Sequence, residues 1–236
     1  LLLEDPTEVL REAKRQGAFI FWNHPNWTGQ APNGVAEMTD FHSDLISEGV
    51  IHGIEVVNDL TYSDEALEMA YDKGLSILGT SDIHGLVDWR YEVAMGGHRS
   101  LSLVFAREKS LESIKEALFA GRTVAALGSL LVGREEFLVP VIEASIMVVS
   151  ATYEVGDLLG VSIENSSSAT FLLRNLSDLN FHNSGDTVMV KARGTTFLQV
   201  KTVERTELVE LEVEVLNALT APKTHPRVVL RIPVEN

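Results

Sequence analysis

Two apolar runs that each end in polar, metal-ligating side chains constrain the fold of this chain most strongly. Residues 18–22 lead into Asn23-His24-Pro25, and residues 76–80 lead into Ser81-Asp82-Ile83-His84. Short apolar runs of this kind are typical of buried strands. In parallel sheets and β/α barrels, ligands bind at the carboxyl ends of the strands. Both polar segments are therefore expected at such an edge.

Helix and strand patterns alternate along the chain up to about residue 127, which predicts an α/β arrangement with parallel strands. The first helix has a capping residue, Asp5, followed by Pro6, and it closes at Gly17. The predicted helices cover 5–17, 41–48, 63–73 and 110–120, and the predicted strands cover 18–22, 53–58, 76–80, 101–105 and 123–127.

The pattern changes near Gly133. Beyond it the chain shows short alternating runs and turn residues, and no helix is predicted. The run Val209 to Val215 alternates between apolar and acidic residues, as one half-buried strand would. About seven such strands predict a β-sandwich. We therefore expect two domains, an α/β domain over 1–132 and a β-sandwich over 133–236.

Charge and cysteine content exclude several classes of protein. The chain has 34 acidic and 19 basic side chains, for a net charge of −15. Such a chain repels the phosphate backbone of nucleic acids, so no nucleic-acid partner is expected. With no cysteine, disulfides, thiolate zinc sites and a cysteine nucleophile are excluded, while the compartment stays open. No apolar stretch is long enough to span a membrane.

Three side chains are candidate ligands of a divalent metal ion: His24, Asp82 and His84. If the backbone is extended, Asp82 and His84 point the same way and can bind one ion or a pair of ions. Two imidazoles and a carboxylate suit an ion of intermediate softness, which points to a metallohydrolase. The alternative is that Asp82 caps a turn and that both histidines are ordinary surface or loop residues.

Two other charged residues have candidate roles. Glu55 lies inside an apolar strand, so it is expected to be buried and paired. Its partner is either a metal-ligating histidine, which it would orient from behind, or an arginine. Arg99 precedes a strand and is a candidate for contacting an anionic substrate during catalysis, or else is an ordinary solvent-exposed residue. His42 and His52 are expected to be structural or exposed.

The segments Phe21-Trp22-Asn23-His24-Pro25, Gly53-Ile54-Glu55-Val56-Val57-Asn58 and Gly79-Thr80-Ser81-Asp82-Ile83-His84 resemble the polymerase and histidinol phosphatase (PHP) superfamily. The similarity is to its bacterial phosphoesterase and phosphodiesterase branch, and extends into the β-rich part of the chain. The resemblance implies a distorted seven-stranded β/α barrel that holds two or three divalent ions, Zn, Mn or Fe. It matches His24 to the third metal-binding motif, and Asp82 with His84 to the fourth.

The chain departs from the PHP pattern in its first two motifs, because it contains neither His-x-His nor an Asp-His pair. Five strands are also too few to close the barrel. The chain, which begins Leu1-Leu2-Leu3 without methionine, is therefore expected to be the C-terminal part of a longer protein, with an incomplete barrel that binds metal weakly alone. Its exposed sheet edge is expected to pair with the missing N-terminal part or with a second copy.

Hydrolysis of a small phosphate ester by the intact protein is the function that the resemblance implies. Asn23 and Trp27 are candidate substrate-binding residues: Asn23 directly precedes His24, and Trp27 lies in the only long loop expected at this edge, Pro25 to Thr39. Trp27 has an alternative role, closing the loop by packing. The competing hypothesis for the whole chain is a non-catalytic binding protein, in which the barrel is a scaffold and the sandwich recognises a partner or a sugar.

Overall fold

The computed structural model describes residues 6–235, so the predicted cap at Asp5 lies outside the described residues. The chain divides into two compact units. The first comprises Leu1–Phe137 with Ala221–Lys223, and the second comprises Leu138–Thr220 with Thr224–Asn236. The division lies a few residues beyond the change of pattern at Gly133. Within the described part, no helix is both long and apolar enough to cross a membrane.

The first unit contains a parallel sheet formed by three of the predicted strands. β2 (Gly53–Asn58) pairs in parallel with β1 (Phe21–Trp22) on one side and β4 (Ser76–Thr80) on the other, and the short β3 (Thr61–Tyr62) runs antiparallel to β2. β2 is buried along almost its whole length, as expected for the centre of such a sheet.

The helices α1, α2, α3 and α5 of this unit lie where the sequence predicted them, whereas α4 and the 3-10 turn η1 were not predicted. Ser63 caps α3 by accepting a hydrogen bond from the backbone N–H of Ala66 (3.1 Å), and Ser110 caps α5 in the same way. α3 packs on β2 and β4 through fully buried Ala66 and Leu67. The bounds of the helices are α1 Pro6–Arg15, α2 Asp40–Ser47, α3 Asp64–Asp72, α4 Val87–Arg90, the 3-10 turn η1 Val93–Met95 and α5 Leu111–Phe119.

The prediction that all five strands are parallel is wrong for β5 (Leu101–Val104). This strand pairs antiparallel with β6 (Thr123–Leu127), which in turn pairs antiparallel with β7 (Leu130–Gly133). The start of β5 lies beside Gly79, because Oγ of Ser102 accepts the N–H of Gly79 and donates to its carbonyl, both at 2.9 Å. The end of β5 lies nearer the start of β4, because Thr123, the β6 partner of Val104, donates a hydrogen bond to the carbonyl of Ile77 at 2.7 Å. β5 therefore runs opposite to β4.

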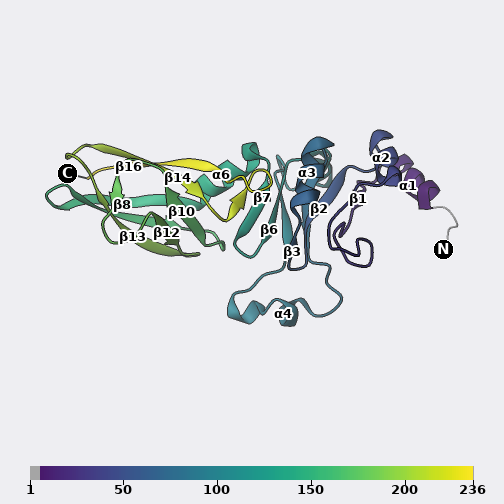
Figure 1. Ribbon diagram of the computed structural model, residues 1–236, viewed down its shortest axis with the longest axis horizontal. Helices are drawn as coiled ribbons and strands as arrows, with labels where there is room; N and C mark the ends of the chain where they lie inside the picture. Colours follow the sequence, from purple (N-terminus) through teal and green to yellow (C-terminus); the bar gives the residue numbers. More distant parts are fainter. Residues whose placement is uncertain (1–5, 236) are drawn as a thin grey trace. The chain divides into compact units, whose positions relative to one another are not determined.

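The long segment between β4 and β5 explains this reversal. Residues 81–100 carry α4 and η1 and stand away from the strands of this unit (Figure 1). The hydroxyl of Tyr91 lies 2.8 Å from the carbonyl oxygen of Ser81, and Ser100 donates a hydrogen bond to the carbonyl of Asp59. Both ends of the segment are thus held at the carboxyl edge of the sheet. The chain never returns to the opposite edge before β5, so β5 must run back from the carboxyl edge.

The second unit consists mainly of two four-stranded antiparallel sheets, whose strands run lengthwise beside one another (Figure 1). Strands of the two sheets contact each other, as in a β-sandwich. One sheet has the order β12-β10-β14-β16 and the other β11-β13-β9-β8. The strand bounds are β8 Ile146–Val155, β9 Leu158–Asn165, β10 Phe171–Asn175, β11 Asn180–Phe181, β12 Thr187–Val190, β13 Gly194–Lys201, β14 Leu208–Val215, β15 Ala218–Leu219 and β16 Arg227–Pro233.

Alternation of side chains builds the core of this unit. In β14, Val209, Leu211 and Val213 are buried, whereas Glu210 faces solvent. The exception on the polar face is Glu214, which is buried and is paired with Arg174.

Beyond Gly133, where no helix was predicted, the structure contains α6, Glu135–Ser145. Pro140 lies inside it, and a proline in a helix interior removes a backbone hydrogen bond and crowds the preceding turn. The helix forms despite this cost because Leu138 and Ile142, one turn apart, are both fully buried. Burial of that face outweighs the local preference of the sequence.

Replacing Phe171 tests the core of the second unit. Its side chain is fully buried in β10, so Phe171→Ala is expected to reduce the free energy of unfolding of this unit by roughly 3–5 kcal/mol. Phe197→Ala is the matched control, because this ring is 49% exposed in β13, and it should cost at most about 1.5 kcal/mol. Urea denaturation followed by circular dichroism measures both. Equal losses would contradict the assigned core.

Candidate metal and phosphate site at the sheet edge

Each of the three parallel strands is followed by a His or Asp residue in a left-handed backbone conformation. His24 follows β1 with φ of 33°, Asp59 follows β2 with φ of 49°, and Asp82 follows β4 with φ of 45°. Residues other than glycine adopt this conformation rarely, and Asp and His are among those that tolerate it best. Such strained residues cluster at functional sites. Each parallel strand is therefore followed, within two residues of its carboxyl end, by a polar side chain.

Glu55 joins the ends of these three strands. Its carboxylate, in the middle of β2, is only 4% exposed. One oxygen accepts the backbone N–H of His24 at 2.6 Å and the amide of Asn58 at 2.9 Å, and the other accepts the hydroxyl of Thr80 at 2.6 Å. The structure thus gives Glu55 three hydrogen-bond donors and no arginine. It positions His24 through the backbone rather than through the imidazole ring.

The imidazole of His24 lies among amide side chains. Its Nε2 is 2.7 Å from Nδ2 of Asn23, and its Nδ1 is 3.3 Å from Nε2 of Gln30. The indole of Trp27 meets the His24 ring edge-on, with ring centroids 5.3 Å apart. One of the two amides must move aside before a ring nitrogen of His24 can bind a metal ion.

Asp82 and His84 are both exposed and are arranged more openly. Nδ1 of His84 lies 2.6 Å from the backbone carbonyl oxygen of Asp82, and because a carbonyl can only accept, Nδ1 carries the proton. The lone pair of His84 is then on Nε2, which is the arrangement that metal-ligating histidines usually have. The Asp82 carboxylate accepts no hydrogen bond from the part of the chain that the structure describes.

These residues fit a divalent ion in chemical type but do not form a complete binding site. Two imidazoles and a carboxylate are suitable ligands for Zn, Mn or Fe. The side chains of Asp82 and His84 are exposed, so an ion can reach them. Within residues 6–235, however, no three His, Asp or Glu side chains gather as a group that could hold an ion. The described residues can supply individual ligands, so further ligands would have to come from outside them.

Asp59 organises a second cluster at this edge that the sequence analysis did not identify. Its carboxylate pairs with Arg90 and lies 2.9 Å from the hydroxyl of Tyr91, which also contacts Ser81. The hydrogen bond from the Arg90 guanidinium lowers the pKa of Asp59, and burial raises the pKa of Tyr91 to about 12. The sequence could have indicated Asp59 as a site residue, because it comes after a predicted strand, as His24 and Asp82 do.

The other predicted site residues lie around the same edge. Arg99 immediately precedes Ser100, which bonds to Asp59, and its exposed guanidinium forms no hydrogen bond or ion pair with the described residues. Trp27 is 56% exposed, and its ring lies so close to Gly29 that a Cβ there would fall 2.4 Å from it. Asn23 is exposed and has its amide against His24.

Residues 146–231 match the model of a family described as an Ig-like domain. The whole chain is similar to the crystal structure of a two-domain protein from Bacteroides vulgatus that contains a predicted PHP-like metal-dependent phosphoesterase. The TM-score is 0.87 at 32% sequence identity, and the match covers 98% of this chain and 66% of the other. The chain thus spans just under two thirds of that protein. No curated protein matches it.

Replacing Glu55 tests the junction of the three strands. Glu55→Gln keeps the shape but removes the negative charge. Its carbonyl oxygen can still accept from His24 and Asn58, while its amide faces the Thr80 hydroxyl, which must then accept instead of donate, so hydrogen bonds to a charged group become neutral ones. We expect a loss of about 1–3 kcal/mol in the free energy of unfolding of the first unit, measured by urea denaturation. Glu68→Gln, an exposed position in α3, should change it by at most about 0.5 kcal/mol. Equal effects would contradict the role of Glu55.

Asp59 should make stability depend on pH. Because its pKa is lower in the folded than in the unfolded protein, Asp59 stabilises the fold above the unfolded-state pKa of about 3.9. That contribution is lost as the pH falls through the folded-state pKa. The difference in unfolding free energy between the native protein and Asp59→Asn should therefore be constant above about pH 5 and shrink below pH ~4. Urea denaturation across this range measures it, and a difference independent of pH would refute the pairing with Arg90.

Proposed function

We propose that this chain is part of a metal-dependent phosphoesterase of the PHP type. The observation that carries the proposal is the similarity over 98% of the chain to the Bacteroides vulgatus protein, whose description names such an enzyme. That similarity agrees with the three PHP-like segments of the sequence: two of them end at one edge of a parallel sheet, at His24 and at Asp82–His84, and the third forms its central strand β2.

In this proposal His24, Asp82 and His84 are ligands of divalent ions, Zn, Mn or Fe. A bound divalent ion acidifies water and neutralises charge on phosphoryl oxygens. Glu55 keeps His24 in place through its backbone amide, and Tyr91 restrains the backbone at Ser81, just before the Asp82–His84 pair. The two or three ions of a PHP site need further ligands, which would come from outside residues 6–235 or from another chain.

Arg99, Trp27 and Asn23 are the proposed substrate contacts. A guanidinium without an ion pair among the described residues can bind a phosphate group through paired N–H donors. Trp27 is exposed enough to contact the organic part of a substrate, and Asn23 can hydrogen-bond to it. With a net charge of −15, the protein is suited to a small phosphate ester held by local positive groups rather than to nucleic acid.

A binding protein without catalysis is the second candidate. The match of residues 146–231 to an Ig-like domain favours it, because sandwich domains serve many functions unrelated to hydrolysis. In that case the first unit would be a scaffold. Catalytic turnover separates the two candidates directly.

The test uses the protein at its natural length, with p-nitrophenyl phosphate and bis-p-nitrophenyl phosphate as substrates and Mn²⁺ or Zn²⁺ added. We expect metal-dependent hydrolysis of at least one ester. Asp82→Asn should reduce kcat/KM by more than about 100-fold, the upper range for residues that only support a metal ligand. Asp88→Asn, at an exposed position in α4 on the same segment, is the matched control and should retain activity. No turnover of either ester would favour the binding protein, and equal activity of the two variants would remove Asp82 from the site.

A further inference from the structure

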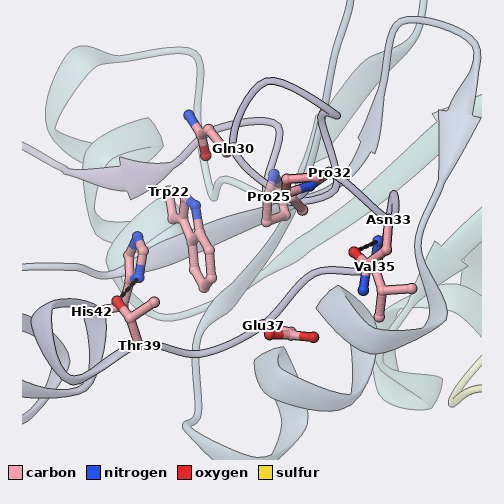
Figure 2. Close-up of a pocket in the computed structure, with 10 residues that line it drawn as sticks. Trp22, Pro25, Gln30, Pro32, Asn33, Val35, Glu37, Thr39 and His42 are labelled. Carbon is pink, nitrogen blue, oxygen red and sulfur yellow. Dashed lines mark hydrogen bonds between the residues drawn. The ribbon is translucent and has the colours of Figure 1, made fainter.

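A cavity of about 350 Å³ lies beside the proposed metal edge, under the loop between β1 and α2 (Figure 2). Its size is near the lower end of the range for small-molecule sites, which suits a single ring rather than a long chain. Pro25, the residue after His24, lines it, and so does Gln30, whose amide contacts the His24 ring. The cavity therefore adjoins the place where the proposed chemistry would occur.

Trp22 provides an unpaired hydrogen-bond donor at this cavity. Its side chain lines the cavity and is 7% exposed, and its indole N–H is buried with no hydrogen-bond partner in the described residues. Leaving a buried donor unpaired costs free energy, and native proteins rarely do so unless a ligand or water completes the bond. The orphaned N–H is an observation independent of the cavity. An oxygen acceptor on a bound molecule would satisfy it once the indole turns slightly toward the cavity, because the nitrogen itself is enclosed.

The indole of Trp22 forms an aromatic wall of the cavity, and only a small part of its surface is exposed there. The imidazole of His42 stacks on the indole of Trp22 with ring centroids 3.7 Å apart. In Figure 2 the His42 ring lies on one side of the indole, while Asn33 and Val35 lie on the other. Burial lowers the pKa of His42, so this wall is uncharged at neutral pH. The part of the indole surface that lines the cavity can pack against the C–H groups of a ring.

The remaining polar groups offer both donors and acceptors. Oδ1 of Asn33 accepts the backbone N–H of Val35 at 3.0 Å, which leaves the amide Nδ2 as a donor. Glu37 contributes an acceptor carboxylate. No Lys or Arg lines the cavity, so it repels a phosphate group. An apolar wall combined with donors, acceptors and a single carboxylate suits a neutral ring bearing several hydroxyl groups.

We propose that this cavity binds the alcohol part of the phosphate ester, a neutral polyhydroxylated ring about the size of one sugar, with an oxygen of the ring accepting the Trp22 indole N–H. As a subsite, the inference rests on the proposed phosphoesterase function. Binding of the neutral ring by itself does not depend on metal or on phosphate, so the two proposals can fail separately.

The test titrates the metal-free protein with methyl α-D-glucopyranoside, methyl β-D-ribofuranoside, myo-inositol and glycerol while recording the indole N–H signals of the three tryptophans by NMR. Trp22→Phe assigns its signal. We expect at least one ring polyol to shift the Trp22 signal saturably, with a Kd of roughly 1–10 mM, while Trp89, 81% exposed, does not respond. Absence of a Trp22 shift up to about 50 mM for all four compounds would overturn the proposal.

Two substitutions locate the binding. Val35→Phe should fill the cavity and abolish the shift, whereas Val9→Phe, a similarly exposed valine in α1, should leave it unchanged. Glu37→Gln keeps the cavity open and should weaken binding by about 5- to 10-fold through loss of a charged acceptor. A shift that survives both Val35→Phe and Glu37→Gln would place the polyol elsewhere and overturn the assignment.

Hydrolysis kinetics then test whether the alcohol part of the ester occupies the cavity. In the active protein, Val35→Phe should raise KM for glucose 6-phosphate by at least about 10-fold and leave kcat/KM for methyl phosphate unchanged, because only the sugar ester occupies the cavity. Equal effects on both esters would overturn the subsite. Polyol binding in a protein without any phosphoesterase activity would refute the proposed function and leave the cavity a polyol site of another protein class.

Discussion

The buried carboxylate of Glu55 is the interaction on which the proposed site depends most. β1 has only two residues in its pairing with β2, so ladder hydrogen bonds alone position its carboxyl end weakly. Glu55 compensates by binding the N–H of His24, while its other oxygen holds the end of β4 through Thr80. A buried charge is tolerated because three donors surround it. The same bonds that satisfy the carboxylate fix the spacing of the polar residues at the edge.

Opposite charges organise the edge around that carboxylate. Asp59 is neutralised by Arg90, whereas Asp82 and Arg99 have no ion-pair partner in the described residues. An unpaired carboxylate attracts a cation, and an unpaired guanidinium attracts an anion. In a protein with a net charge of −15, such local groups, rather than the overall field, would have to attract the proposed phosphate ester. The adjoining cavity, which is lined by a carboxylate and by no basic residue among those described, would complement them by accepting the uncharged part of the proposed substrate.

The second unit relies on a different source of stability. Its sheets bury alternating aliphatic side chains, and its one buried carboxylate, Glu214, is paired with Arg174. The titratable groups that characterise the edge of the first unit have no counterpart in its core among the described residues. This is consistent with the match of residues 146–231 to an Ig-like domain, a fold defined by its packing. The proposed metal and substrate site therefore lies in the first unit.

Periodicity and end signals in the sequence by themselves determined most of the helices and strands, the change to an all-β pattern near Gly133, and the position of His24, Asp82 and His84 at strand ends. These are local properties, because apolar spacing and capping residues act within a few positions of the chain.

Tertiary structure alone decided the direction of β5, the formation of α6 around Pro140, the hydrogen-bond partners of Glu55 and the unpaired N–H of Trp22. Each depends on which distant segments meet: Tyr91 and Ser100 keep residues 81–100 at one edge, and burial of Leu138 and Ile142 outweighs the proline. Contacts across tens of residues leave no periodic trace in the sequence, and the three-dimensional packing is what determines them.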